Sequence, residues 1–451
     1  MSDILYESTN GKAEKVPFRQ VLLAGQAPDG GLYVPESIPG LSPDEISSFK
    51  DKPYADVAYA VTGKFLEGEL PANELWRIVE DAYSFPVPLE KVFDRVHVMR
   101  LDRGPTAAFK DFAARMMARL MSFFIIQEDR RLLILTATSG DTGSAVAHAF
   151  YGVDNIDVVV LFPEREVTGM QRRQMTTLGG NISCIAVDGK FDDCQRLVKS
   201  AFSDVELEGL GLSSANSINF GRLLPQTVYY FYAYANLFEE DGEQIVFSVP
   251  SGNFGNLMGG VFAREMGLPV KRFVVATNEN DEFPRFISSG VYEPISPSRE
   301  CISNAMNVGN PSNLARLVHL YGGFLDEKGF LQKKPDMQSL RRDFYSTSIS
   351  NTETRDAIKE VYEKYSMILE PHGAVGWAGL MKYLGESAWN GLSVSLETAD
   401  PAKFPEEITK ALGVKPELPE SMKDLEDKEE DYRKMKSDYS ALKKYLLDGF
   451  A

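Results

Sequence analysis

The chain has 451 residues, of which 43% are hydrophobic, and its 65 acidic residues outnumber 48 basic ones to give a formal net charge of −17. This length predicts two or three globular domains, and the charge argues against a nucleic-acid partner and against attraction to an anionic membrane. No apolar run reaches about 18 residues and no secretory signal pattern opens the sequence, so we expect a cytoplasmic protein that does not enter a membrane.

The first part of the chain is interrupted repeatedly by proline and glycine, as in "QAPDGGLYVPESIPGLSP". Such clusters mark turns and loops, and only short periodic segments lie between them. We therefore expect residues 1–95 to form a separate N-terminal domain.

The stretch "RGPTAAFKDFAARMMARLM" places a lysine, Lys110, at the start of an amphipathic helix. Its apolar positions follow helical spacing: Phe112, Ala113, Met116, Met117 and Leu120. The positive end of the helix dipole makes this position unfavourable for an ammonium group. One interpretation is a solvated lysine beside Asp111. The other is a lysine with a lowered pKa, neutral often enough to form a Schiff base.

From Leu132 onward, short β-rich runs alternate with intervals long enough for helices. The strand candidates are "LLILT", "DVVVLF", "ISCIAV", "IVFSVP" and "RFVVA". This alternation predicts parallel α/β sheets that are covered on both faces. At the end of the chain, apolar residues spaced by threes, fours and sevens predict an amphipathic helix packed on the body: Met422, Leu425, Tyr432, Met435, Tyr439, Leu442 and Leu446.

Two glycine-containing turns, "TSGDTG" and "SGNFGN", each follow a predicted strand and open a predicted helix. Such a turn directs backbone N–H groups and the positive end of a helix toward one point, which suits a phosphate or a carboxylate. Ordinary βα turn chemistry is the alternative for either turn taken alone. Neither turn has the spacing of the dinucleotide fingerprint or of the Walker loop.

Other kinds of chemistry find less support in the sequence. The three cysteines and four histidines have no metal-ligand spacing, so we expect no metal site. The turn "TSGDTG" also lacks the GxSxG pattern of a serine nucleophile. A reactive lysine together with anion sites favours pyridoxal phosphate as the cofactor.

A series of motifs between about residue 6 and residue 412 resembles threonine synthase in its longer form. They are "APDGGLYVPE", "GPTAAFKD", "TATSGDTG", "QMTTLGGN" with "AVDGKFDDCQ", "SSANSINFGRLLPQTVYYF", "VPSGNFGNLMGG", "MGLPVKRFVVATNENDEFPRF", "PSNLARL", "EPHGAVG" and "TADPAKF". The resemblance implies the conversion of O-phosphohomoserine and water to threonine and phosphate. It leaves open whether the protein is a monomer or a homodimer.

The resemblance also implies a fold: the α/β fold type II of pyridoxal-phosphate enzymes, with two parallel-sheet α/β domains and the additional N-terminal domain. The large, cofactor-binding domain would comprise residues 96–130 and 241–451, and the small domain residues 131–240.

The site residues are carried over by motif. Lys110 matches the lysine that binds the cofactor covalently, and Thr398 matches a hydroxyl that faces the pyridine nitrogen and, as a neutral partner, leaves it unprotonated. The loop that surrounds the cofactor phosphate matches Gly252, Asn253, Phe254, Gly255 and Asn256. Thr138 and Ser139 match residues that hold the substrate carboxylate. The substrate phosphate would lie among Thr142, Asn216, Ser217 and Arg222, because a dianion suits fixed donors and a forked cation.

Three residues depart from the family pattern. Arg103 replaces a histidine before "GPT", and Glu397 and Asp400 stand in "ETADPAKF" where "STAHPAKF" is usual. These changes bear on the choice of substrate, and two alternatives to threonine synthesis stay open. One is a phospholyase or β-substituting enzyme of the same fold, acting on O-phosphohomoserine or a related phospho-amino acid. The other is a non-catalytic binding module, which would have no chemical need for Lys110.

Overall fold

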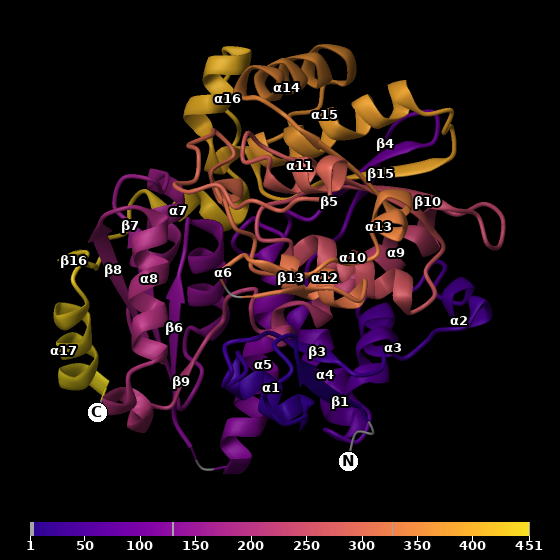
Figure 1. The fold of residues 1–451 in the computed structure, drawn as a ribbon. Coiled ribbons are helices and arrows are strands. Elements are labelled where there is room, and N and C mark those ends of the chain that lie inside the picture. Colours follow the sequence, from indigo (N-terminus) through magenta and orange to yellow (C-terminus); the bar gives the residue numbers. More distant parts are fainter. Residues whose placement is uncertain (1–3, 129, 327, 451) are drawn as a thin grey trace.

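The protein is described by a computed structural model that covers residues 4–128, 130–326 and 328–450. It contains two parallel sheets, one at the left of Figure 1 and one toward the upper right, with the N-terminal residues below them. None of the helices in these residues combines the length and apolar composition that crossing a lipid bilayer requires.

The larger sheet has six strands in the order β14-β11-β10-β15-β5-β4. All neighbours are parallel except the antiparallel pair β4 and β5. The strands are β14 (Phe344–Ser348), β11 (Val270–Thr277), β10 (Ile245–Pro250), β15 (Leu392–Glu397), β5 (Val96–Arg100) and β4 (Leu89–Phe93). One face packs against α14 (Asn351–Tyr365), α15 (Pro371–Glu386) and α16 (Pro405–Leu412) through a separate apolar cluster.

The smaller sheet has five parallel strands in the order β16-β8-β7-β6-β9. They are β16 (Arg433–Lys436), β8 (Ile182–Asp188), β7 (Ile156–Pro163), β6 (Leu132–Ala137) and β9 (Leu212–Ser213). One face packs against α8 (Phe191–Phe202) and α17 (Tyr439–Phe450). The other packs against α6 (Asp141–Phe150) and α7 (Gly169–Thr176). All five strands expected from the sequence are present, divided between the two sheets.

The N-terminal residues form a small antiparallel sheet with helices beside it. The sheet has the order β2-β1-β3, from β1 (Leu5–Ser8), β2 (Val16–Pro17) and β3 (Tyr33–Pro35). The helices are α1 (Phe18–Ala24), α2 (Pro43–Ser47), α3 (Tyr54–Leu66) and α4 (Ala72–Ala82). Because β4 pairs with β5 of the six-stranded sheet, the elements of this unit end at α4, earlier than residue 95.

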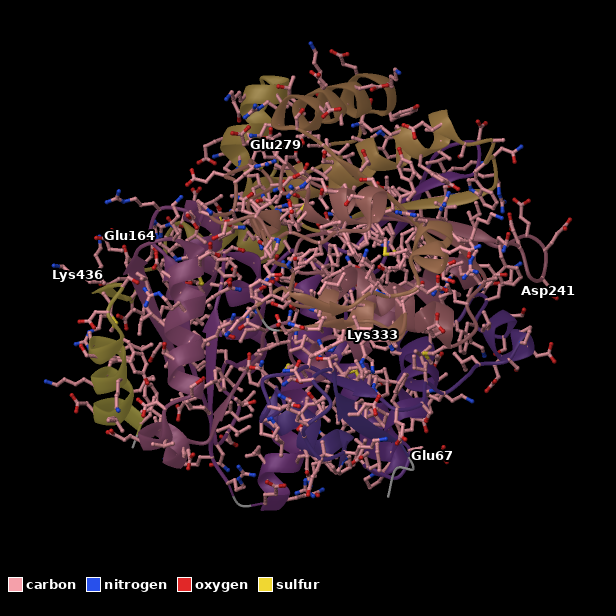
Figure 2. All side chains as sticks on the ribbon, in the orientation of Figure 1. Glu67, Glu164, Asp241, Glu279, Lys333 and Lys436 are labelled. Atoms are coloured by element: carbon pink, nitrogen blue, oxygen red, sulfur yellow. The ribbon has the colours of Figure 1, made fainter. Side chains whose placement is uncertain are left out.

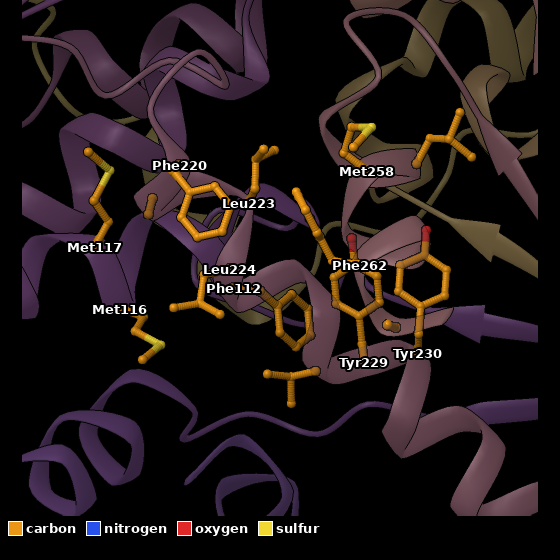
Figure 3. Close-up of a cluster of buried hydrophobic side chains, with 14 of the residues drawn as sticks. Phe112, Met116, Met117, Phe220, Leu223, Leu224, Tyr229, Tyr230, Met258 and Phe262 are labelled. Carbon is orange, nitrogen blue, oxygen red and sulfur yellow. The ribbon is translucent and has the colours of Figure 1, made fainter. Parts of the chain in front are cut away.

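A continuous core joins the N-terminal unit to both sheets. Figure 3 shows its centre, where Phe112 and Met116 of α5 (Lys110–Glu128) lie near side chains of α9 (Val228–Leu237) and α10 (Gly255–Glu265). Tyr229 is fully buried there and stacks edge-on with Phe112. Charged side chains such as Lys333, Lys436 and Asp241 project from the outside of the molecule in Figure 2.

The end of the chain differs from the expected single helix. The apolar residues from Met422 onward are divided among a 3-10 turn (Glu420–Leu425), β16 and α17, except Tyr432, which directly precedes β16. A parallel strand next to β8 satisfies backbone groups that a longer helix would have left on an open sheet edge. Residues 433–450 therefore lie with the five-stranded sheet, although the sequence assigned them to the large domain.

Candidate active site

Residues that follow the carboxyl ends of β6, β10 and β15 line one cavity. Ligands of α/β sheets bind at such ends. Every site residue implied by the resemblance lines this cavity: Lys110, Thr138, Ser139, Thr142, Asn216, Ser217, Arg222, Gly252, Asn253, Phe254, Gly255, Asn256 and Thr398. A second cavity between α4, α5 and α6 is lined by none of these residues.

Lys110 begins α5, as the helical spacing predicted, and the turn before it is closed by side-chain bonds. The Asp111 carboxylate accepts from the Thr106 backbone N–H at 2.8 Å and from the Thr106 hydroxyl at 2.6 Å. The Phe109 N–H donates to the Thr398 carbonyl at 2.8 Å, and the Asp400 N–H donates to the Ala107 carbonyl at 3.0 Å. These backbone bonds place Lys110 beside the segment that follows β15.

The environment of Lys110 favours its neutral form. Burial is the main cause that lowers the pKa of Lys110 to about 8; Asp141 opposes the shift, whereas Lys403 and Arg222 add to it. Asp111 uses both carboxylate oxygens on Thr106 rather than on the lysine. Of the two interpretations left open by the sequence, the structure thus favours a lysine of lowered pKa over a solvated one.

The loop after β10 turns sharply into α10. Phe254, the residue before the helix, has φ +62°, in the left-handed region. A Cβ at Gly252 would come within 2.9 Å of the Ala305 carbonyl oxygen, and one at Gly255 within 3.2 Å of the Ser217 Cβ. The Asn256 Oδ1 accepts from Tyr229 and Tyr230, while its Nδ2 has no partner among the described residues. Both glycines therefore permit close approach to a helix N-terminus that suits an anion.

The turn after β6 opens α6 in a similar way. The Thr138 hydroxyl oxygen accepts from the N–H groups of Gly140, at 2.9 Å, and Gly143, at 2.7 Å. Its hydroxyl hydrogen is left to donate to a ligand. Gly140 has φ +129°, and a Cβ there would meet the Gln171 side chain. Thr138, Ser139 and Thr142 thus present hydroxyl groups beside the N-terminus of α6.

Arg222 is a buried cation with little compensation from the protein. Its side chain donates through Nη1 to the Ala215 carbonyl at 2.6 Å, and its Nε has no partner among the described residues. Burial lowers the pKa of Arg222 to about 10. Leaving such a charge unpaired is costly unless an anion joins it. Arg222 and the neighbouring Asn216 and Ser217 line the cavity together.

Thr398 belongs to a buried hydrogen-bonded chain. Its hydroxyl donates to Glu370 Oε1 at 3.0 Å. Glu370 caps α15, where it also accepts from the N–H groups of His372 and Gly373 at 2.7 and 2.9 Å. His372 Nδ1 lies 2.5 Å from Glu370 Oε2, and its Nε2 accepts from the Ala305 N–H at 3.0 Å.

A buried ion pair beside the cavity, between Lys403 and Asp141, was not identified from the sequence. The Lys403 ammonium lies 2.7 Å from Asp141 Oδ1 and donates to the Thr106 carbonyl at 2.9 Å. Both side chains are buried, and the neighbouring cations hold the pKa of Asp141 below its usual range despite burial. Asp141, Lys403, Glu370 and His372 all stand inside motifs quoted above. Without knowledge of their contacts, these residue types alone do not indicate a functional role.

The three departures from the family pattern compensate one another in part. Arg103 Nη1 lies 3.7 Å from Asp400 Oδ2, so the added positive and negative charges face each other. Glu397 accepts from the Glu370 N–H at 2.7 Å, and a Cβ at Gly373 would collide with its Oε2. Burial, and then the nearby Glu370, raise the pKa of Glu397, which favours its neutral form. These changes therefore add little net charge to the cavity.

The residues of the cavity fit pyridoxal phosphate. They provide an amine of lowered pKa, a helix N-terminus entered through two glycines, and a hydroxyl at Thr398. The unpartnered Arg222 Nε and Asn256 Nδ2 are donors that a phosphate-bearing ligand can use.

Comparison with known proteins agrees with this fit. Residues 86–394 match the family model "Pyridoxal-phosphate dependent enzyme". The fold and the site define an enzyme that depends on pyridoxal phosphate and has fold type II. Residues 5–83 match "Threonine synthase N terminus", and residues 373–446 match "Threonine synthase, C-terminal". The chain belongs to the threonine synthase family.

Individual relatives cover almost the whole chain. Threonine synthase of Haemophilus influenzae is 42% identical over 435 residues, which are 96% of this chain and 97% of that protein. A crystal structure of pyridoxal-phosphate-bound threonine synthase from Brucella melitensis has a TM-score of 0.92 and 36% identity, covering 99% of this chain and 100% of its own. The Escherichia coli structure has a TM-score of 0.89 and 38% identity, with coverage of 98% and 99%.

Proposed function

We propose that this protein converts O-phosphohomoserine and water to threonine and phosphate, with pyridoxal phosphate bound covalently to Lys110. The observation that carries the proposal is the presence, in one cavity, of a lysine with a pKa of about 8 and a buried arginine whose Nε has no partner in the part of the chain that the structure describes. The first suits covalent attachment to a carbonyl. The second suits a phosphate that becomes a leaving group.

Cofactor binding is assigned to two parts of the cavity. The backbone of Gly252, Asn253, Phe254, Gly255 and Asn256 holds the cofactor phosphate, and Thr398 faces the pyridine nitrogen. When bound, the cofactor supplies an electron sink for negative charge that develops beside the amino group of the substrate.

The substrate is held at both ends. The hydroxyls of Thr138 and Ser139 bind its carboxylate, next to the N-terminus of α6. Its phosphate lies against donors from three segments: Thr142, Asn216, Ser217 and Arg222. This arrangement fixes the reacting carbon atoms between two anchored anions.

The protein then moves protons at stated atoms. Once the amino group of the substrate has replaced Lys110 on the cofactor, the freed Lys110 amine accepts the proton from the α-carbon of the substrate. The bond between the γ-carbon and the phosphate oxygen breaks while Arg222 stabilises the negative charge on the departing phosphate. A second proton leaves the β-carbon as the phosphate departs, and one proton is returned to the γ-carbon, which ends as a methyl group. Water then adds its hydroxyl to the β-carbon, the α-carbon regains a proton, and the remaining proton of the water ends on the released phosphate. One water is consumed and one phosphate released for each threonine.

A product assay tests the proposal. Purified protein loaded with pyridoxal phosphate is incubated with O-phosphohomoserine, and threonine, phosphate and 2-oxobutyrate are measured together. We expect threonine and phosphate in equal amounts. Release of 2-oxobutyrate as the main product would instead identify a phospholyase of the same fold. No phosphate release at all would support a binding module.

The cellular setting and subunit organisation are also proposals. We infer a cytoplasmic location, on the basis of the composition, and an enzyme active as a monomer or a homodimer. The division into a large domain (residues 89–130 and 241–432), a small domain (residues 131–240 and 433–450) and an N-terminal unit is supported by sheet membership. Light scattering of the purified protein measures the subunit number.

A further inference from the structure

A short helix, α12 (Leu314–Leu320), begins beside two loops of the candidate active site. Its Arg316 side chain is fully buried and donates to backbone carbonyls from two parts of the chain. Nη1 donates to the Ser217 carbonyl at 3.1 Å, Nη2 to the Ile218 carbonyl at 2.5 Å, and Nε to the Tyr33 carbonyl of β3 at 2.9 Å. Arg316 therefore connects the N-terminal unit with the loop that carries Ser217.

Asn313, the residue before α12, adds a second connection. Its Nδ2 donates to the carbonyls of Ser217, at 3.2 Å, and Asn253, at 3.0 Å. Its Oδ1 accepts from Arg316 Nη1 at 2.5 Å, and the side chain is fully buried. Asn313 thus joins the loop assigned to the substrate phosphate, at Ser217, to the loop assigned to the cofactor phosphate, at Asn253. We call Asn313 and Arg316 the α12 clamp.

The loop that the α12 clamp contacts also carries Asn216 and Arg222. Within this loop the Asn219 N–H donates to the Asn216 carbonyl at 3.1 Å, and the Arg222 N–H donates to the Asn219 carbonyl at 3.0 Å. Asn219 Nδ2 donates to the Leu22 carbonyl of α1 at 2.8 Å, so the N-terminal unit supports the loop at a second point. A shift at Ser217 would therefore move Asn216 and Arg222 with it.

Packing alone does not account for a buried charge at Arg316. No carboxylate in the described part of the chain pairs with this guanidinium, and burial lowers the pKa of Arg316 to about 9. Burying a cation among neutral partners costs free energy that an apolar side chain would not. A planar guanidinium, however, can hold several carbonyl oxygens at fixed positions, which neither an apolar side chain nor a single ammonium can do.

We propose that the α12 clamp positions the substrate phosphate site: it fixes Asn216, Ser217 and Arg222 relative to the cofactor loop before the substrate binds. Neither clamp residue is among the described residues that line the cavity, so both act through the loop as positioning residues. This inference rests on the proposed function. It also gives the N-terminal unit a part in the reaction, because the Tyr33 carbonyl helps to orient Arg316.

The clamp predicts a selective effect on ligands that carry a phosphate. Donors that are already in place stabilise the departing phosphate without reorganisation. Threonine has no phosphate, and its carboxylate is assigned to Thr138 and Ser139, on another loop. Loss of the clamp should therefore weaken phosphate binding and leave threonine binding intact, whereas general damage to the fold would weaken both.

The test compares these two ligands on protein loaded with pyridoxal phosphate, in which the cofactor loop is already filled. Isothermal titration calorimetry measures the binding of inorganic phosphate, and the absorbance of the cofactor reports the binding of threonine. Hydrogen–deuterium exchange measures the opening of residues 214–222. In Arg316→Met we expect the Kd of phosphate to rise about tenfold or more. Threonine should bind as in the parent protein, and residues 214–222 should exchange faster.

Arg316→Lys keeps the inference testable if Arg316→Met does not fold. It retains the charge, but one ammonium cannot hold the carbonyls of Tyr33, Ser217 and Ile218 together. We expect the same selective loss of phosphate affinity, to a smaller extent.

Arg115→Met is the matched control. Arg115 also donates to backbone carbonyls of the N-terminal unit, those of Ala82 and Asp81, both at 2.7 Å, and it does not line the active-site cavity. This variant should lower thermal stability and leave phosphate binding unchanged. Parental phosphate affinity in the Arg316 variants, or an equal loss for phosphate and threonine, would overturn the inference. A parent protein that binds neither inorganic phosphate nor O-phosphohomoserine would overturn the proposed function, and the phosphate role of the clamp with it.

Discussion

At the scale of single residues, the cavity is organised around charges that the protein leaves partly uncompensated. Lys110 and Arg222 are both lowered in pKa by burial, and Arg222 adds to the shift of Lys110. Buried cations without a paired anion destabilise the protein when no ligand is bound. They are expected where a ligand supplies the opposite charge. Asp141, the acidic group that most opposes the lowered pKa of Lys110, is already paired with Lys403.

The pKa of Lys110 predicts how the apoprotein captures its cofactor. Only the neutral amine attacks the aldehyde, and below the pKa its population falls about tenfold per pH unit. Covalent capture of pyridoxal phosphate should therefore accelerate with rising pH and level off near pH 8. Capture rates are followed by absorbance between about pH 6 and pH 10, and borohydride reduction with peptide mapping locates the label.

Two variants control this measurement. Lys110→Ala should abolish covalent capture, whereas Lys333→Ala, at an exposed position, should behave like the parent protein. Label on any lysine other than Lys110, or a rate that keeps rising to pH 10, would contradict the assignment.

We predict that a change at Arg222 lowers turnover and leaves substrate binding largely intact. Arg222→Lys keeps a positive charge but loses the planar fork that matches a phosphate. We expect turnover to fall at least tenfold, about 1.4 kcal/mol in the barrier, while substrate still binds to the loaded protein. Stopped-flow absorbance reports binding, and phosphate release reports turnover.

Arg131→Lys is the control for this change, because the side chain of Arg131 is 80% exposed and does not line the cavity. It should leave both quantities unchanged. Parental turnover in Arg222→Lys, or loss of substrate binding, would show that Arg222 does not act on the departing phosphate.

At the scale of elements, the sequence predicted well what depends on local pattern. The strands that end at Ala137 and Pro250 and the helices that begin at Asp141 and Gly255 follow from hydrophobic runs and glycine turns. The α5 helix and the position of Lys110 follow from spacing in the same way. Thr398 and Arg222 did not follow from pattern; only the resemblance identified them, because their roles depend on distant partners.

The start of α10 gives a prediction about the cofactor phosphate. In Gly255→Asp the new Cβ would lie 3.2 Å from the Ser217 Cβ. The carboxylate would stand beside the proposed position of the cofactor phosphate. We expect the dissociation constant of pyridoxal phosphate to rise at least tenfold, about 1.4 kcal/mol. Equilibrium dialysis of the reconstituted protein measures it.

Gly169→Asp is a matched control, since Gly169 is also the first residue of a helix, α7, and a Cβ there meets no atom within 4 Å. An aspartate at that position should be tolerated, because it lies near the positive end of the helix. Equal cofactor affinity in both variants would mean that the phosphate binds elsewhere.

At the scale of the whole molecule, the least predictable feature is the return of the chain end to the small sheet. Residues 433–436 form a short edge strand beside β8, and Figure 1 shows α17 next to it, at the outside of that sheet. Apolar spacing identified residues such as Leu442 and Leu446 as buried, which is confirmed. It could not identify the surface they cover, because strand pairing between residues far apart leaves no local periodic signal.

This arrangement predicts that α17 stabilises the small sheet. Leu446 is fully buried against the cluster that includes Leu197 and Leu207, so Leu446→Ala should lower the free energy of unfolding by about 2–5 kcal/mol. Lys444→Ala on the exposed side of the same helix should change it by less than about 0.5 kcal/mol. Urea unfolding followed by circular dichroism compares the two, and limited proteolysis detects a released chain end. If Leu446→Ala were as stable and as resistant to protease as Lys444→Ala, the chain end would be an appendage, and the small sheet would derive its stability from β6, β7 and β8 alone.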